Sequence, residues 1–444
     1  MMKLSNYNKF VKHDGKYICF NAMSGGLFTI TVEQRSAIIK YEHDVQELEK
    51  KVKPLYDALV KTRFIIPDTM NELNIIKLRY QRDVFINNNY HLIINPTMDC
   101  NFKCWYCYET HKKSKMSVDI QKGIVKHLKA LIEDRKISGL SLSWFGGEPL
   151  LFFEDIIYSL SRQLKQLMEN EDMPFTNSMT TNGYLFKKGW INKIIDINIK
   201  HFQITLDGNK AKHDNSRTTI GGGKTYDKIV NNINMLCKEI DDLSITLRIN
   251  YKNETLDDIN EIINSFDEDI RHKINVSFHR IWQTYDEDII LNDKYSVERD
   301  KFKASGFVVN NSSFQLYKGC KCYADRWNEI LLNYDGLAYK CTARNFTKEN
   351  SLGELQPDGK IKWDTAKLAN RFCKSGFDNA VCLDCKLLPM CGGFCSQKII
   401  EVHEKNLQAA CQLNFQELSV DDFIINRYKL LLSNKHSKIT RHIK

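Results

Sequence analysis

Residues 99–109 have the sequence DCNFKCWYCYE, in which Cys100, Cys104 and Cys107 follow the spacing CxxxCxxC. Thiolates are soft ligands that select iron–sulfur clusters, zinc or copper(I). Three thiolates leave one iron of a cubic cluster without a protein ligand, and an open metal position is where chemistry takes place. The loop therefore predicts a reactive iron–sulfur site in a redox enzyme.

Strand and helix patterns alternate around this loop, over residues 87–283. Apolar runs typical of strands occur at 91–96, 140–145, 175–180, 201–206, 243–250 and 275–281. Helical stretches lie between them, at 118–135, 155–168, 226–239 and 256–265. Six strands separated by helices imply parallel βα units, and right-handed crossovers would curl these units into a partial (β/α)6 TIM-like barrel of the α/β class.

Short polar motifs follow the predicted strands. The cysteine loop comes after the first strand, GGEP at 146–149 after the second, TNG at 181–183 after the third and DG at 207–208 after the fourth. Active sites in such folds lie at the C-terminal ends of the strands. The placement of the motifs therefore supports the barrel prediction.

A second group of eight cysteines lies downstream, at Cys320, Cys322, Cys341, Cys382, Cys385, Cys391, Cys395 and Cys411. Eight thiolates can close two clusters completely, which suits electron transfer. A zinc ribbon is the alternative, but zinc would leave the CxxxCxxC beside a GGEP strand end unexplained. We expect residues 315–444 to be a Cys-rich domain stapled by metal, with a hairpin over 329–340 that delivers Cys341.

Residues 1–86 predict a separate N-terminal extension. Strand patterns at 9–11, 17–20 and 27–31 precede helical patterns at 32–41 and 45–61, as in a small winged-helix-like unit. Such a unit either binds a peptide by adding a strand to an exposed edge or packs as a structural extension, and both alternatives stay open. Residues 284–314 are polar and irregular, which is typical of a linker.

Composition favours a soluble cytoplasmic protein of 444 residues. No apolar run reaches the ~18 residues of a membrane span, and the N-terminus lacks the apolar segment of a signal peptide. Cytosolic thiols stay reduced, so the 14 cysteines indicate metal sites. The formal charge of +9 falls to roughly +4 with three bound clusters, which is a poor argument for nucleic acid.

The order CxxxCxxC, GGEP, TNG, LDG resembles the radical S-adenosylmethionine (SAM) superfamily. The downstream cysteines resemble its SPASM extension, found on peptide-modifying members, with the pattern C-x(9–15)-G-x4-C, then C-x2-C-x5-C-x3-C, then C. Thirteen residues separate Cys322 from Gly336, and four separate Gly336 from Cys341. The two resemblances cover roughly residues 90–415.

The resemblance implies specific roles in the first site. Cys100, Cys104 and Cys107 would hold a 4Fe–4S cluster whose open iron binds SAM, and reduction would yield a 5′-deoxyadenosyl radical that removes a hydrogen atom from substrate. Gly146 and Gly147 would allow close approach of the methionine ammonium. The remaining SAM contacts implied are Glu148 as an acceptor for that ammonium, Tyr106 beside adenine, and Thr205 and Arg217 at the ribose and carboxylate.

The resemblance also assigns two auxiliary 4Fe–4S clusters. One would be bound by Cys322, Cys341 and Cys395 with Cys320, and the other by Cys382, Cys385, Cys391 and Cys411. The tight spacing of Cys320 and Cys322 leaves open that one of them is free and that an open iron binds substrate. Of the other cysteines, Cys19 and Cys237 predict buried structural thiols, and Cys373 is either structural or a hydrogen donor.

The implied reaction is oxidative modification of a ribosomally made precursor peptide with a leader, through a thioether, C–C or C–O crosslink. An external donor of the flavodoxin or ferredoxin type would supply electrons. Sulfatase-maturing relatives, which make formylglycine, carry an Asp as general base after the cysteine that matches Cys341; here Thr342 stands there. A further alternative is a peptide-binding protein without catalysis, in which the clusters only stabilise the fold. This alternative predicts loss of the open-iron cysteines or of the glycine pair, and both are present in the sequence.

Several polar residues have two interpretations. Asp325, Glu329 and Arg344 lie near cluster cysteines, where they either assist proton loss or form surface ion pairs. The scattered histidines His201, His213 and His279 are expected to be satisfied by ordinary hydrogen bonds rather than to bind metal.

Overall fold

The computed structural model describes residues 1–86, 88–251, 259–281, 292–309, 322–373, 376–401, 411 and 419–440. The chain forms two compact units, each assembled from separate stretches. One comprises Met1–Ile86, Ser312–Arg326 and Ala369–Lys444, and the other Asn87–Asn311 and Trp327–Leu368. Cys320 and part of the predicted 284–314 linker lie outside the described residues.

The second unit is built on one large sheet. Six neighbouring strands run parallel, in chain order, and confirm the six predicted strands: β6 (Asn89–Ile94), β8 (Gly139–Trp144), β9 (Phe175–Thr181), β10 (Ile199–Leu206), β12 (Ser244–Tyr251) and β13 (Ile274–Arg280). The mixed α/β architecture with a largely parallel central sheet is therefore as the sequence predicts.

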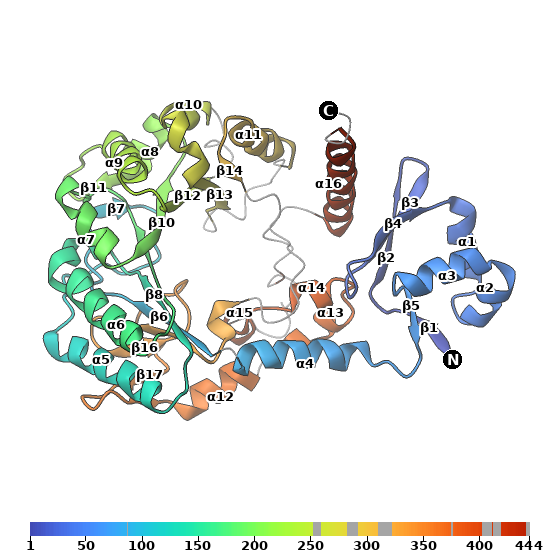
Figure 1. The fold of residues 1–444 in the computed structure, drawn as a ribbon, viewed down its shortest axis with the longest axis horizontal. Coiled ribbons are helices and arrows are strands. Elements are labelled where there is room, and N and C mark those ends of the chain that lie inside the picture. The colour runs from blue at the N-terminus through green and yellow to red at the C-terminus, as the bar shows by residue number, and fades with distance from the viewer. Residues whose placement is uncertain are drawn as a thin grey trace. The chain divides into compact units, whose positions relative to one another are not determined.

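Helices cover the outer face of this sheet (Figure 1). They are α5 (Val118–Glu133), α6 (Ser159–Asn170), α7 (Ile191–Asp196), α8 (Lys210–Ser216) and α9 (Tyr226–Glu239), with α10 (Asn260–Asn264) further along. Ser117 caps α5 by accepting the Ile120 backbone N–H, as N-cap serines do. Apolar side chains of strands and helices, such as Leu142 and Leu160, are completely or almost completely buried between the two layers.

Four strands from the predicted Cys-rich region extend the same sheet beyond β6. They are β15 (Glu329–Leu332), β16 (Leu337–Tyr339), β17 (Gly353–Leu355) and β18 (Ile361–Trp363). The antiparallel pair β15–β16 confirms the predicted hairpin. The parallel pairing of β15 with β6 was not predicted, because it joins segments that lie more than 200 residues apart.

The predicted linker contains regular structure where it is described. α11 (Asn292–Ala304) is followed by β14 (Val308–Val309), which pairs in parallel with β13. Phe302 is buried against Phe278 and Phe307. The packing of these aromatic side chains explains why a polar segment folds. The predicted domain boundaries stay a prediction.

The first unit begins with the predicted N-terminal strands, confirmed as the antiparallel sheet β2 (Asn8–His13), β3 (Lys16–Asn21) and β4 (Leu27–Ile30). Its other N-terminal elements are β1 (Met2–Leu4), α1 (Val32–Lys40), α2 (Val45–Lys51), α3 (Lys53–Lys61), β5 (Ile65–Pro67) and α4 (Glu72–Phe85). The single helix predicted over 45–61 is wrong. It is broken at Val52, since Pro54 cannot continue a helix from the preceding turn.

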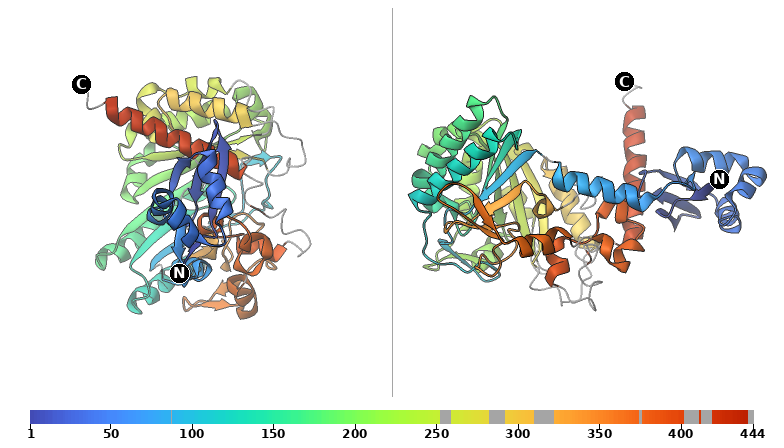
Figure 2. Two further views of the ribbon diagram at one scale, coloured as in Figure 1. Left: turned by 90° about the vertical axis from the view of Figure 1, so that its right-hand side faces the viewer. Right: turned by 90° about the horizontal axis from the view of Figure 1, so that it is seen from below.

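Helices complete the first unit, namely η7 (Tyr323–Asp325), α13 (Ala380–Leu383), α14 (Leu388–Cys391), α15 (Ser396–Glu401) and the longer α16 (Val420–Thr440), together with α12 (Thr365–Cys373) from Ala369 onward. Figure 2 shows these elements from two further sides. Phe20 and Ile18 of β3 pack in one apolar cluster with Phe394 and Phe423. The N-terminal sheet and the cysteine-bearing helices therefore share a core. Among the described residues, no helix is long and apolar enough to cross a membrane.

Candidate functional site

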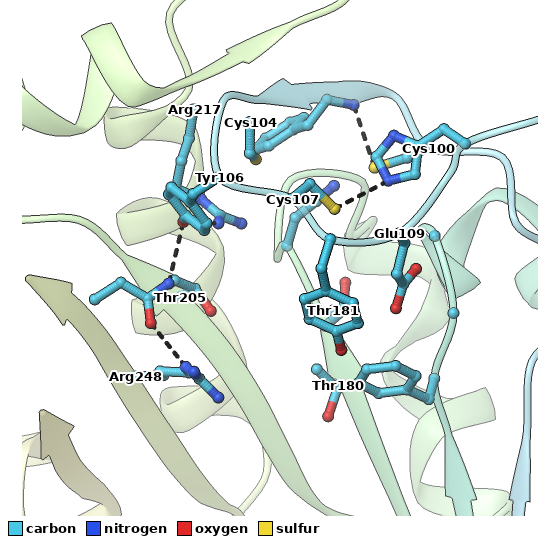
Figure 3. Close-up of a pocket in the computed structure, with 18 of the residues that line it drawn as sticks. Cys100, Cys104, Tyr106, Cys107, Glu109, Thr180, Thr181, Thr205, Arg217 and Arg248 are labelled. Atoms are coloured by element: carbon cyan, nitrogen blue, oxygen red, sulfur yellow. Dashed lines mark hydrogen bonds between the residues drawn. The ribbon is translucent and has the colours of Figure 1, made fainter. Parts of the chain in front are cut away.

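A cavity of about 190 Å³ lies at the carboxyl ends of the parallel strands (Figure 3). Eight of the nine residues predicted for the cluster and SAM line it, namely Cys100, Cys104, Cys107, Tyr106, Gly146, Gly147, Thr205 and Arg217. They come from the loop after β6, the loop after β8, β10 and the start of β11 (Arg217–Thr219). The fold therefore brings together residues that are spread over more than 100 positions.

The cysteine loop is held by a small second sheet. β7 (Phe102–Cys104) pairs antiparallel with β11, and the register sets Cys104 opposite Arg217. The backbone N–H of Phe102 approaches the Cys100 Sγ at 3.4 Å. On the other side of the loop, 3.4 Å separates the Cys107 Sγ from His111 Nε2. The positions of the three thiols are thus set by backbone pairing and local hydrogen bonds.

The three thiols line one cavity, and three thiolates are the ligand number of a cubic cluster with one open iron. Among the described residues, no three His, Cys, Asp or Glu side chains converge on a point that would hold one ion. In a cubic cluster each cysteine binds a different iron, so thiols spread around a cavity are the expected arrangement. Burial raises the pKa of all three thiols, that of Cys107 to about 11, so metal binding must displace their protons.

The glycine pair after β8 packs directly on the cysteine loop. A Cβ at Gly146 would lie 2.5 Å from the Thr97 carbonyl oxygen, and one at Gly147 would lie 2.2 Å from the Asp99 carbonyl oxygen. Gly146 also has a φ of 104°, which side chains rarely adopt. These contacts give the glycines a packing role that the sequence did not reveal, beside the predicted approach of the methionine ammonium.

Glu148 lies outside the cavity lining, unlike the other predicted contacts. Its side chain is completely buried, and its carboxylate accepts hydrogen bonds from Leu150 N at 3.0 Å, Thr181 Oγ1 at 2.7 Å and Asn182 N at 2.7 Å. The carboxylate therefore joins the loop after β8 to the end of β9. Its predicted contact with SAM stays a prediction.

Tyr106 is the centre of a buried polar network in the cavity wall. Its hydroxyl donates to Asp207 Oδ2 at 2.6 Å and accepts from Arg217 Nη1 at 2.6 Å and from Asn250 Nδ2 at 3.1 Å. Arg217 Nε and Asp207 Oδ1 are buried and have no hydrogen-bond partner among the described residues. Buried polar atoms of this kind are usually paired, so the wall retains hydrogen-bonding capacity for a polar ligand.

Other residues that line the cavity were not predicted, among them two polar residues of β12 and one carboxylate of the cysteine loop. Arg248 and Asn250 lie two positions apart on β12, and Arg248 Nε donates to Asn250 Oδ1 at 2.8 Å. The period of two along a strand puts both side chains on one face, and a charged residue within an apolar run was the signal available in the sequence. Glu109 also lines the cavity, and burial raises its pKa to about 7.

The loop after β16 is tied to the cysteine loop. Tyr108, which follows Cys107, donates to the Thr342 carbonyl oxygen at 2.7 Å. Asn345 Oδ1 accepts from the Thr110 backbone N–H at 3.1 Å, and Asn345 Nδ2 donates to Thr110 Oγ1 at 2.9 Å. Because Thr342 follows Cys341, these bonds fix a predicted auxiliary ligand next to the first site.

The remaining described downstream cysteines belong to the first compact unit. Cys322 and Cys395 share a hydrogen bond, which lowers the pKa of Cys395 and raises that of Cys322. Cys382, Cys385, Cys391 and Cys411 belong to or pack against one apolar cluster. Burial raises the pKa of Cys385, and the charge of nearby Cys411 adds to the effect.

The other polar residues weighed in the sequence are mostly buried and paired. Asp325 forms an ion pair with Arg371, and the Glu329 carboxylate lies 2.5 Å from His91 Nδ1. Both carboxylates are therefore interior, whereas Arg344 donates locally to the Ala343 carbonyl.

The predicted hydrogen bonds of the histidines are confirmed. His201 bonds Thr246, His213 bonds the Asp207 backbone and Thr225, and His279 bonds Ser277. Cys19 and Cys237 are buried, as expected, and Cys373 is exposed.

The stretch of chain that carries most of this cavity is similar to known proteins. The family described as the radical SAM superfamily matches residues 94–266. An uncharacterized protein of Synechocystis sp. is 29% identical over 193 residues, which cover 42% of this chain and 47% of that protein. The chain thus spans about half the length of this relative. A cysteine-type anaerobic sulfatase-maturating enzyme of Clostridium novyi is 21% identical over 383 residues, which cover 79% of this chain and 96% of that enzyme.

Solved structures show the same fold. The structure of anSMEcpe with bound AdoMet superposes with a TM-score of 0.58 at 18% identity, over 78% of this chain and 95% of that one. Streptococcus suis SuiB bound to precursor peptide SuiA superposes with a TM-score of 0.51 at 16% identity, over 91% of this chain and 98% of that one. At such identities the likeness concerns the fold.

Proposed function

We propose that this chain, in which residues 94–266 form a radical SAM domain, oxidatively modifies a ribosomally synthesised precursor peptide. The reaction we favour is formation of a thioether, C–C or C–O crosslink. The observation that carries the proposal is the cavity of Figure 3, where three spread thiols face a cationic polar wall at the strand ends.

The residues of the cavity fit a 4Fe–4S cluster with SAM. Cys100, Cys104 and Cys107 would hold the cluster, and, when bound, this pair of cofactors supplies the radical that removes a hydrogen atom from substrate. Arg217 has an unpaired buried Nε and would neutralise the carboxylate of SAM. Thr205 would hydrogen-bond the ribose, and the Tyr106 ring, whose hydroxyl is fixed by three partners, would lie beside the adenine.

The auxiliary cysteines would form two further 4Fe–4S clusters that accept the electron released when a substrate radical closes a crosslink. Tyr108 holds the Cys341 loop against the first site, which would keep an acceptor near the modified residue. Cys320 is proposed as the fourth ligand beside Cys322, Cys341 and Cys395. Reducing equivalents would come from a flavodoxin- or ferredoxin-type donor.

The N-terminal unit would bind the leader of the precursor. In the described sheet, β3 is central and β2 and β4 form the two edges, and an extended peptide can add a strand to such an edge. SuiB, which has the same fold over most of its length, is solved with its precursor peptide.

Formylglycine formation is the second candidate, because the similarity to the Clostridium novyi sulfatase-maturating enzyme spans nearly the whole of that enzyme. Thr342 argues against it. A carboxylate expected as general base is replaced by a hydroxyl, and Tyr108 already occupies the Thr342 backbone carbonyl. A threonine does not accept a proton at neutral pH as a carboxylate does.

The test begins with anaerobic reconstitution of the full chain with iron and sulfide. We expect about twelve irons, four for each of three clusters, and dithionite-dependent release of 5′-deoxyadenosine that is lost in Cys104→Ala. Incubation with short peptides encoded near the gene, followed by mass spectrometry, should show a loss of two hydrogens. Zinc in place of iron, or iron without cleavage of SAM, would leave a metal-stapled peptide-binding protein.

A further inference from the structure

A buried ion pair joins the segments that carry two of the downstream cysteines. Asp325 Oδ1 lies 3.4 Å from Arg371 Nη2, and both side chains are less than a tenth exposed. Asp325 also accepts from the Ser396 hydroxyl and from the Ser396 backbone N–H. One carboxylate therefore binds a residue next to Cys395 and a cation from α12.

Arg371 reaches the same two segments independently. Its Nε donates to the Ala324 carbonyl at 3.2 Å, and its Nη1 donates to Gln397 Oε1 at 2.7 Å. The guanidinium thus bridges the segment after Cys322 and the segment after Cys395. A planar fork of donors suits such a bridge, which a lysine could not reproduce.

These contacts also determine where Cys322 and Cys395 lie. The Asp325 backbone N–H donates to the Cys322 carbonyl at 3.1 Å, which closes one tight turn, and Ser396 directly follows Cys395. The two thiols share a hydrogen bond. Fixing Asp325 against Ser396 therefore fixes Cys322 beside Cys395.

We propose that Asp325 and Arg371 are positioning residues that hold Cys322 and Cys395 together before any metal arrives, as a preformed edge of one auxiliary cluster. A buried ion pair adds little net stability compared with an apolar pair of similar volume, so its effect here is on geometry. The cluster part rests on the proposed function; the pairing of the two thiols does not.

Thiol crosslinking in the full-length, metal-free protein tests the pairing. Diamide takes two electrons and two protons from a pair of thiols as an S–S bond forms. Peptide mapping of the wild type should show Cys322–Cys395 as the main bridge among these cysteines. The double variant Asp325→Leu/Arg371→Met removes both charges together, so no buried charge is left unpaired, and it should lower the yield of this bridge at least fivefold.

One further variant provides a second test of the pairing, and another serves as a control. Ser396→Ala leaves the ion pair intact and should lower the yield about twofold, and it applies even if the double variant does not fold. Lys386→Met removes a cation of the same unit whose Nζ donates to the Asn6 carbonyl instead, and it should change nothing. Wild-type yield in the double variant, or no Cys322–Cys395 bridge in the wild type, would overturn the proposal.

Iron counting tests the auxiliary clusters separately from the positioning role of Asp325 and Arg371. After reconstitution, the double variant should hold about eight irons against about twelve in the wild type. A wild type with about four irons and an intact crosslink pattern would refute the auxiliary clusters and leave the positioning role standing. Twelve irons in the double variant would refute the positioning role and leave the clusters standing.

Discussion

The substitution Gly147→Ala tests the packing of the glycine pair on the cysteine loop. The added Cβ would lie 2.2 Å from the Asp99 carbonyl oxygen and 2.7 Å from the Met98 carbonyl carbon and oxygen. Ordinary contact begins at 3.4 Å, so the backbone at Asp99 must move by about 1.2 Å. No flexible side chain can absorb this shift, because all three nearest atoms belong to the main chain.

Gly147→Ala is expected to lower both the free energy of unfolding and the rate of the reaction. Overpacking of a well-packed site costs about 1–3 kcal/mol of unfolding free energy. Since Cys100 follows Asp99 directly, a shift near 1 Å also misplaces a cluster ligand, and a 1 Å misplacement can lower a rate by about 100-fold. We therefore expect Gly147→Ala to lose iron on reconstitution, to unfold at lower urea and to release 5′-deoxyadenosine about 100-fold more slowly.

Gly189 provides the matched control, because a Cβ at Gly189 would meet nothing within 4 Å. Gly189→Ala should change the unfolding free energy by less than about 1 kcal/mol and leave iron content unchanged. If Gly147→Ala keeps full iron and stability but binds SAM more weakly, the glycine serves the methionine ammonium and the packing argument is wrong. Wild-type behaviour in every assay would refute both roles.

Three further predictions follow from buried polar contacts. Tyr106→Phe leaves Asp207 without its 2.6 Å donor, so it should cost about 1–3 kcal/mol in urea unfolding and weaken SAM binding in equilibrium dialysis, with unchanged iron content. Burial lowers the pKa of His127, which bonds the Gly359 carbonyl at 2.8 Å. The unfolded state therefore binds a proton that the folded state does not. The free energy of unfolding should fall as pH drops below about 6.5, by up to about 1.4 kcal/mol per pH unit. In His127→Gln, the free energy of unfolding should lose this dependence on pH. Arg371→Met alone leaves a buried carboxylate unpaired and should lower the unfolding free energy by about 3–5 kcal/mol, whereas an unchanged urea midpoint would show that the ion pair is hydrated.

Local sequence signals were enough to predict the parallel sheet and the edge that carries the site. Apolar runs bounded by helical patterns define the six parallel strands β6, β8, β9, β10, β12 and β13. The motifs after these strands fall at one edge because parallel strands share their C-terminal side. The break at Pro54 was also present in the sequence, since proline removes a helix hydrogen bond. It was missed because the apolar period continues through it.

Contacts between distant segments could not be predicted in this way. The pairing of β15 with β6 depends on which sheet edge is left open after the other strands have associated. The Tyr106 network joins residues more than 100 positions apart, and no local period encodes such a contact. Arg371 and Asp325 are residue types that usually form ion pairs at the surface. The sequence therefore did not indicate that their ion pair is buried.

The register of β7 and β11 connects the metal ligands to the cation of the cavity wall. Cys104 stands opposite Arg217, and Lys103 stands opposite Thr218. A shift of one residue would turn each side chain of β11 to the other face, so Arg217 would leave the cavity while Cys104 stayed. The proposed SAM-binding cation is therefore set by the same two short strands that set the cluster ligand. Substitutions that loosen β11 should then weaken SAM binding and cluster retention together, although β11 itself carries no ligand to the metal.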